Sequence, residues 1–248
     1  MRESIEKRFE NGILRTETKF LNDDDSIGVN ENGISIIVTL LNKKSKISET
    51  IFYNSDYSVI VSPLLKYAIS IMKEDKDYYE IAFFDEFHNP VLNHQNVHKI
   101  IKIRSKELSE FSVYGTDGKL TQSSEINDNY AIERTIYDKA GNIILEEYFD
   151  KNNKRMNNSK GIAKYVFEFD NYNRDKKIKS EFFDKFGTPV CNEKGYAKYV
   201  AKYLPGDGFL ITRVLEQFYD EKGQLIKENN KITEYERTPN WCSFVNYD

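Results

Sequence analysis

Residues 182–199 read FFDKFGTPVCNEKGYAKY, and residues 83–93 read FFDEFHNPVLN. The second stretch matches the beginning of the first at seven of eleven positions, although 99 residues separate them. Both open with two aromatic residues and an aspartate, and both contain Pro-Val a few positions later. A segment that returns at a distance in this way indicates a repeat architecture, so the fold depends on what one copy forms.

An aromatic residue followed by aspartate, or by glycine in one looser copy, recurs along most of the chain. The aromatic anchors are Phe84, Tyr114, Phe149, Phe183 and Tyr219, and successive anchors are 30, 35, 34 and 36 residues apart. A second series lies between them, at Tyr137, Phe169 and Tyr203. Each unit therefore contains two turns, and the period is about 34 residues.

The turn signature is typical of a β-hairpin. Aspartate at the first position accepts a hydrogen bond from the backbone two residues on. Glycine or asparagine three residues on adopts the positive φ of a type I turn with a G1 bulge. The flanking sequence IAKYVFEF, residues 162–169, alternates between two faces as a strand does. We therefore predict a mainly β protein, an antiparallel β-hairpin repeat array that forms an extended twisted or coiled sheet.

The turn signature occurs in only part of the chain, and this divides the chain into three predicted regions. Residues 80–228 are the predicted hairpin repeats, residues 1–79 a small α+β N-terminal cap, and residues 229–248 a C-terminal tail or cap. Within the first cap, Ile34–Leu41 and Ile51–Val61 are rich in β-branched residues and predict strands. Ser62 and Pro63 precede LLKYAISIM with helical spacing, so we expect one short helix between Ser62 and Lys73.

The aromatic residues of the predicted strands form a candidate interaction surface. Tyr165 and Phe167 share one strand face, and Tyr199 and Tyr203 repeat that arrangement one unit later. Stacked repeats would place Tyr165 beside Tyr199 as a cross-strand pair. Such a ladder serves either core packing or recognition of a partner, because tyrosine and phenylalanine offer large rigid contact areas. Both interpretations are open from the sequence.

Composition narrows the class of partner. The chain has 248 residues, 31% of them charged, and a net charge of −4 with the two signs interspersed. A basic stripe for a phosphate backbone is lacking, so we expect no nucleic-acid partner. No apolar run approaches a signal peptide or membrane span, so we expect no membrane association and a cytoplasmic location, with leaderless secretion left open. Cys191 and Cys242 have no short spacing and are expected to be reduced.

Motifs for catalysis and cofactor binding are missing from the sequence. It contains no G-x-S-x-G, Walker A, G-x-G-x-x-G, H-E-x-x-H or C-x-x-C. We therefore expect no cofactor and no catalytic residues, although triads also assemble from distant positions. The histidines His88, His94 and His98 fall within eleven residues and suggest a metal site as an alternative. The repeat alignment favours exposed turn residues, because His88 occupies the position of Gly187 in the matching unit.

The phrase in residues 182–199 resembles bacterial β-hairpin repeat arrays. These are the YD repeats of RHS-like proteins, the MORN-like repeats, and arrays with the pattern D-x-x-G-x-P-V-x-N-x-x-G-Y-A. The resemblance covers roughly residues 80–228 and implies fold more than function. It leads us to expect a module that binds a protein partner or a second copy of itself. Alternatives are an immunity or effector-associated protein of a bacterial toxin system, and a carbohydrate-binding or carbohydrate-active protein.

Overall fold

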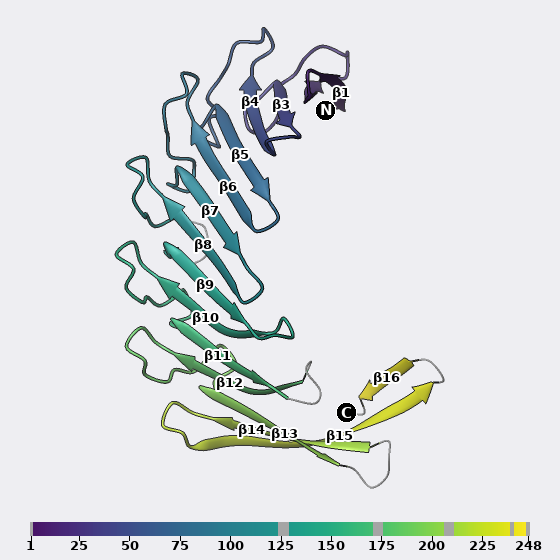
Figure 1. Cartoon of the computed structure of the whole chain (residues 1–248), viewed down its shortest axis with the longest axis vertical. Helices are drawn as coiled ribbons and strands as arrows, with labels where there is room; N and C mark the ends of the chain where they lie inside the picture. The colour runs from purple at the N-terminus through teal and green to yellow at the C-terminus, as the bar shows by residue number, and fades with distance from the viewer. Residues whose placement is uncertain (1, 124–128, 171–175, 206–210, 239–240, 247–248) are drawn as a thin grey trace. The chain divides into compact units, whose positions relative to one another are not determined.

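The computed structural model describes residues 2–123, 129–170, 176–205, 211–238 and 241–246, and only the backbone at 204–205, at 211–213 and from 230 onward. It consists of β-strands joined by turns and loops (Figure 1). The strands are β1 (Arg2–Glu10), β2 (Ile13–Leu21), β3 (Ile36–Asn42), β4 (Ile47–Tyr53), β5 (Ile69–Asp75), β6 (Tyr78–Phe84), β7 (Lys99–Arg104), β8 (Leu108–Tyr114), β9 (Ile132–Tyr137), β10 (Ile143–Phe149), β11 (Lys164–Phe169), β12 (Lys177–Phe183), β13 (Lys198–Pro205), β14 (Ile211–Tyr219), β15 (Leu225–Thr238) and β16 (Trp241–Asn246).

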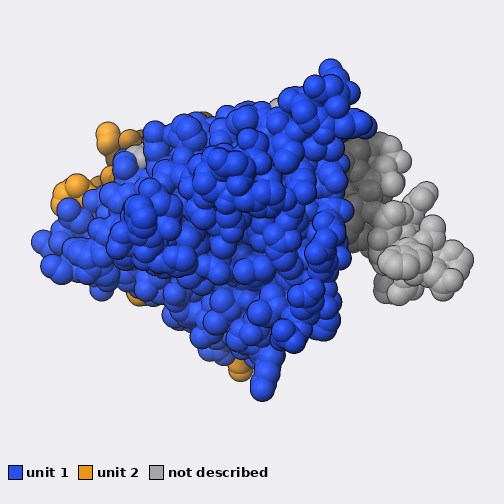
Figure 2. Space-filling model, turned by 90° about the horizontal axis from the view of Figure 1, so that it is seen from above, with its two compact units in different colours: residues 1–133, 150–154 blue, residues 134–149, 155–248 orange. Residues whose placement is uncertain are grey.

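The strand order in the sheet follows the order in the chain, from β1 to β16. Consecutive strands pair antiparallel, as in the nine-residue register of β1 with β2 and the six-residue register of β7 with β8. The predicted antiparallel hairpin array is therefore confirmed. By internal contacts the chain forms two compact units, coloured separately in Figure 2: unit 1 (residues 1–133 and 150–154) and unit 2 (residues 134–149 and 155–248).

Two kinds of connection alternate along the chain. Within the described residues, short turns join odd strands to the next even strand, as between β1 and β2 and between β5 and β6, and longer loops lead from even to odd strands through β12 (Figure 1). In the loop after β6, Asp85 N donates to Asn89 O at 3.0 Å and His88 N donates to Asp85 O at 3.2 Å. His88 has a φ of 63°, so this bend is the predicted type I turn with a G1 bulge.

The same loop then makes a second bend before the next strand begins. Phe84 forms an isolated antiparallel bridge with Pro90, after which Asn93 N donates to Val97 O at 2.9 Å. The Asn93 side chain accepts from Gln95 N and Val97 N, both at 3.0 Å. This loop is therefore two bends in succession, the first capped by Asp85 and the second by Asn93.

The most buried residues of each unit lie where these loops rejoin the sheet. One residue per repeat stands directly after the second bend, and its backbone bonds to the neighbouring strands. It is small in every copy except His98, and we call this place the small-residue position. Tyr148 N donates to Ala163 O at 3.1 Å, and Ala163 N donates to Phe183 O at 2.8 Å. The residues at this position are Ser35, Ala68, His98, Ala131, Ala163 and Ala197, all buried.

The prediction of a helix between Ser62 and Lys73 is wrong, and the α+β cap is not seen. Ser62 does cap a turn, since its Oγ accepts from Leu65 N at 3.2 Å and its carbonyl accepts from Lys66 N at 2.9 Å. Lys66 then adopts a φ of 68°, and Ile69–Asp75 form β5 between β4 and β6. Hydrogen bonding to two neighbouring strands outweighs the helical spacing of the apolar residues.

The loops after β2 and β4 repeat the geometry seen later in the chain. Asn22 N donates to Ser26 O at 2.9 Å, and Asn54 N donates to Ser58 O at 3.0 Å. Both asparagines occupy the position held by Asp85. At the other end, residues 225–238 and 241–246 continue the sheet as β15 and β16, so the backbone of the predicted tail forms a further hairpin.

Candidate interaction surface

In unit 2, aromatic side chains gather on one face of strands β10 to β14. The register pairs Tyr165 with Phe182 and Tyr199 with Phe218, and cross-strand partners project to the same side of a sheet. We call this side the aromatic face. Its members are Tyr148, Tyr165, Phe167, Phe169, Phe182, Tyr199, Tyr203 and Phe218, with Tyr196 packed onto it from a loop.

Ring contacts run across this face without interruption. Tyr165 lies 6.2 Å from Tyr148 and 5.5 Å from Phe182, measured between ring centroids. Phe182 lies 5.8 Å from Tyr196, which in turn lies 5.0 Å from Phe218. These separations and tilted geometries are those of favourable aromatic pairs. The repeats of unit 2 are thus joined by a continuous aromatic ladder.

The ladder divides into a buried row and an accessible row. Tyr148 and Phe182, next to the loops, are 7% and 6% exposed and belong to the core. Phe167 and Tyr203, nearer the opposite ends of the strands, remain half-buried. Core packing and surface exposure therefore both occur on this face, at opposite ends of the strands.

The four aromatic residues predicted as an interaction surface do share this face, but Tyr165 and Tyr199 are not the cross-strand pair that was expected. Strand β12 lies between β11 and β13, so Tyr165 pairs with Phe182 rather than with Tyr199. The predicted pairing aligned β11 with β13 and did not include the strand between them. That strand, β12, supplies the intervening ring of Phe182. Tyr165 and Phe167 stack directly, at 6.2 Å and 27°.

Tyrosine hydroxyls on the aromatic face are hydrogen-bonded to acidic or amide groups. Tyr199 Oη donates to Glu216 Oε1 at 3.2 Å, and burial together with this carboxylate raises the pKa of Tyr199. Tyr148 Oη donates to Glu146, and Asn158 Nδ2 donates to Tyr165 Oη at 3.1 Å. The two carboxylates of this face are therefore already engaged within the protein.

A β-bulge brings one lysine onto the aromatic face. The register of β11 with β12 shifts between Glu168 and Phe169, so that Phe169 stands opposite Lys177. Lys177 Nζ lies 4.1 Å from the ring centroid of Phe167 and 5.9 Å from that of Phe169. Desolvation against these rings lowers the pKa of Lys177. Strict alternation along β12 would place this residue on the other face, which is why the sequence did not indicate it.

The opposite face of unit 2 is charged and internally paired. Lys179 Nζ lies 2.8 Å from Glu168 and 3.0 Å from Glu181, and Lys198 Nζ lies 3.6 Å from Glu181. Arg155 pairs with the buried Glu147 at 2.5 Å. The two faces therefore differ in chemistry, with paired charges on one and aromatic rings with lysine on the other.

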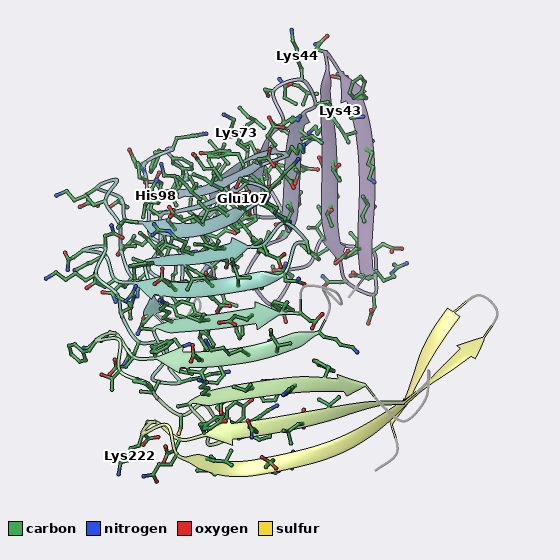
Figure 3. The ribbon with its side chains drawn as sticks, turned by 60° about the horizontal axis from the view of Figure 1, so that its bottom comes forward. Lys43, Lys44, Lys73, His98, Glu107 and Lys222 are labelled. Atoms are coloured by element: carbon green, nitrogen blue, oxygen red, sulfur yellow. The ribbon has the colours of Figure 1, made fainter. Side chains whose placement is uncertain are left out.

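The three clustered histidines do not converge. His88 is exposed, and its Nε2 lies 3.1 Å from Glu49 Oε1. His94 is also exposed, whereas His98 is only 9% exposed and its Nδ1 lies 2.9 Å from Phe83 O. Exposure was therefore predicted wrongly for His98, which fills the small-residue position within the loop end of the sheet (Figure 3). Among the described residues, no three histidine, cysteine or acidic side chains are placed to hold a metal ion.

Cys191 is a free thiol and donates a hydrogen bond from Sγ to Glu221 Oε2 at 2.7 Å. Burial and the adjacent Glu221 carboxylate raise the pKa of this thiol, which disfavours the nucleophilic thiolate. The side chain of Cys242 lies outside the described residues.

No second layer of strands covers the aromatic face in the part of unit 2 that the structure describes, although loops bury the ends that carry Tyr148 and Phe182. Each strand there contacts only the strands that precede and follow it in the chain.

The structure contains no membrane-spanning candidate helix within its described ranges. Compared with known proteins, the chain matches no family model and has no similar sequence among curated proteins.

Proposed function

We propose that this chain is a non-enzymatic module for protein interaction or assembly, and that the aromatic face of unit 2 is its binding surface. The observation that carries the proposal is the ring ladder from Tyr148 to Phe218 on a sheet face with no second layer. Large apolar surfaces left open on a folded protein are characteristic of interaction sites. The partner is a protein segment or a second copy of the chain.

The energetics of recognition favour the accessible row of this face. Phenylalanine and tyrosine are well suited to binding hot spots, because each buries about 150–250 Å² when fully enclosed and has few rotatable bonds. Phe167 and Tyr203 are half-buried before any partner arrives. Lys177 and the stacked Tyr165 restrain the Phe167 ring, and Lys176 restrains the Tyr203 ring. Little conformational entropy would therefore be lost on binding.

Ring orientation argues for a protein rather than a sugar as the ligand. A carbohydrate platform requires ring faces that are open and roughly parallel to the sugar. Here Tyr196 is tilted by 49° to Phe182 and by 66° to Phe218. Lys177 also occupies the face of Phe167. Interlocked rings of this kind match side chains of another protein better than a flat pyranose.

The test is selection of peptides from a random display library by the whole chain, together with its mass in solution by light scattering. The double variant Phe167→Ser/Tyr203→Ser removes the accessible row. Phe186→Ser is the matched control, because Phe186 is 81% exposed at a loop tip away from this face. We expect an enriched peptide motif, or a dimer, that the double variant loses and the control keeps. A monomer that enriches no motif, or enrichment unaffected by the double variant, would contradict the proposal.

A further inference from the structure

Lys177 differs from two other lysines on the strands of unit 2, Lys179 and Lys198, in what surrounds its ammonium group. Lys179 and Lys198 each lie within 3.6 Å of a glutamate carboxylate. Lys177 contacts only the rings of Phe167 and Phe169, and no carboxylate in the described part of the chain pairs with it. Its side chain is nevertheless accessible from solvent. The aromatic face therefore presents a cation held between two rings and open to an incoming ligand.

A second lysine of the same face has a similar environment. Lys227 pairs with Phe218 across β14 and β15, and its Nζ lies 5.8 Å from the Phe218 ring. The acidic residues beside the ladder, Glu146 and Glu216, accept hydrogen bonds from Tyr148 and Tyr199. Both carboxylates keep their negative charge, but tyrosine hydroxyls already occupy them, whereas neither Lys177 nor Lys227 has a carboxylate partner among the described residues. The charged groups of this face that still lack an ionic partner are consequently the lysines.

Partial desolvation of the Lys177 ammonium group favours binding of an anion from a partner. An ammonium group against two rings has lost part of its hydration, and cation–π contacts replace only some of it. A carboxylate placed over Lys177 would restore a full ionic partner in a partly apolar setting, where such a pair is stronger than on an open surface. The bulge that turns Lys177 onto this face fixes the position of the cation relative to the rings.

Building on the proposed function, we propose that the partner is a protein segment carrying an aspartate or glutamate next to an apolar side chain. The carboxylate pairs with Lys177, and the apolar side chain packs on Phe167 and Tyr203. A single ammonium between rings suits a carboxylate better than a phosphate, which calls for several converging donors. An acidic protein strand or loop satisfies both the charge and the rings.

The inference is tested with two strand-length peptides of alternating leucine and glutamate or leucine and glutamine, labelled with a fluorophore and titrated with the intact chain by anisotropy. An acidic polysaccharide, alginate, is titrated in parallel. The variants are Lys177→Gln, Lys177→Arg and the matched control Lys222→Gln. Lys222 is an exposed lysine of the same unit at the β14–β15 turn (Figure 3). Circular dichroism verifies that each variant is folded.

We expect the chain to bind the glutamate peptide about tenfold more tightly than the glutamine peptide, with the preference falling as salt rises. Lys177→Gln should abolish the preference, whereas Lys177→Arg and Lys222→Gln should keep it. A preference that survives in Lys177→Gln overturns the inference, as does binding of alginate without the peptide. If the two peptides bind equally, or the display motif contains no acid, the Lys177 inference fails while the proposed function stands. If no peptide binds and no motif or dimer forms, both fail.

Discussion

The hydroxyl of Tyr57 donates a hydrogen bond to Glu17 Oε1 at 2.7 Å, linking two residues that are 40 positions apart in the chain. His88 repeats the relationship one unit later, with its Nε2 3.1 Å from Glu49 Oε1 over 39 positions. Both donors stand at the positive-φ position of a loop turn, with φ values of 65° and 63°. In unit 1 the loop tip of one repeat is therefore bonded to a strand of the repeat before it.

Removing the Tyr57 hydroxyl should weaken this link. Glu17 is only 5% exposed and also contacts Arg15 at 2.5 Å and Lys19 at 3.2 Å. A hydrogen bond to a charged group contributes about 1.5–3 kcal/mol, and the partial exposure of Tyr57 reduces this figure. We expect Tyr57→Phe to lower the free energy of unfolding by about 1 kcal/mol in urea titrations.

Tyr79→Phe is the control for this substitution. Its hydroxyl makes no hydrogen bond to any described residue, so the same change should shift the unfolding midpoint much less. Equal effects of the two variants would show that the bond to Glu17 contributes nothing specific.

Substitution of Gly33 should destabilise the fold more than substitution of Gly187, because Gly33 lies in close contact with the next loop. Gly33 and Gly187 both have positive φ, at 76° and 85°. A Cβ added to Gly33 would lie 2.8 Å from Pro63 Cδ in the next loop, whereas a Cβ at Gly187 would meet nothing within 4 Å. Gly187→Ala should cost about 1 kcal/mol for the left-handed backbone alone. Gly33→Ala should cost at least about 1 kcal/mol more, because the two loops must move apart.

Thermal unfolding of the two alanine variants provides the measurement. The difference between them isolates the contact with Pro63, since the backbone term is common to both. A Gly33→Ala variant as stable as Gly187→Ala would mean that Pro63 yields freely, and that the two loops are not packed tightly.

The sequence predicted the hairpin array because the turns require particular residues. Aspartate and glycine recur at positions where capping and positive φ leave few alternatives, as at Asp184 and Gly187. The earliest repeats were missed because asparagine takes the role of aspartate at Asn22 and Asn54, and Asp25 and Tyr57 take the positive-φ position. Chemically equivalent substitutions remove a sequence signature while the hydrogen bonds stay the same.

The candidate surface was predicted in part. Alternation along β11 and β13 placed Tyr165, Phe167 and Tyr199 on one face, and the observed registers agree. Lys177 was not predicted, because a bulge changes the alternation at a single position. Nor did the sequence separate buried rings from accessible ones, since that depends on which end of each strand the loops cover.

The small-residue position beside each loop should reject larger side chains. Ala163 is completely buried, and its backbone is hydrogen-bonded to strands on both sides. We expect Ala163→Leu to lower the free energy of unfolding by about 1–3 kcal/mol through overpacking. Ala140→Leu, at an exposed turn position, introduces the same side chain and should be nearly neutral. Equal chemical denaturation midpoints for the two variants would show that the loop end of the sheet is not tightly packed.

Low pH should reduce the folding stability by protonating the aspartates that cap the turns. Asp138 accepts hydrogen bonds from Asn142 Nδ2 at 3.0 Å and from the backbone nitrogens of Asn142 and Ala140. The Asn142 side chain, followed by these backbone donors, holds the pKa of Asp138 below its usual value. A folded-state pKa that is lowered contributes stability above the unfolded pKa of about 3.9, and this contribution is lost as pH falls through the folded value.

Asp138→Asn should therefore destabilise the chain near neutral pH, because an amide in place of Oδ2 cannot accept from Asn142 Nδ2. The difference from the wild-type chain should shrink as the pH falls from about 4 through the lower pKa of folded Asp138, where the wild-type carboxylate also becomes protonated. Thermal midpoints measured across this range report the effect. Asp117→Asn serves as a control, because among the described residues the Asp117 carboxylate accepts a single backbone bond, from Lys119 N at 3.0 Å, and its ion pair with Lys119 is long, at 4.0 Å. A stability difference for Asp138→Asn that stays constant from neutral to acid pH would show that the charge on this turn does not contribute.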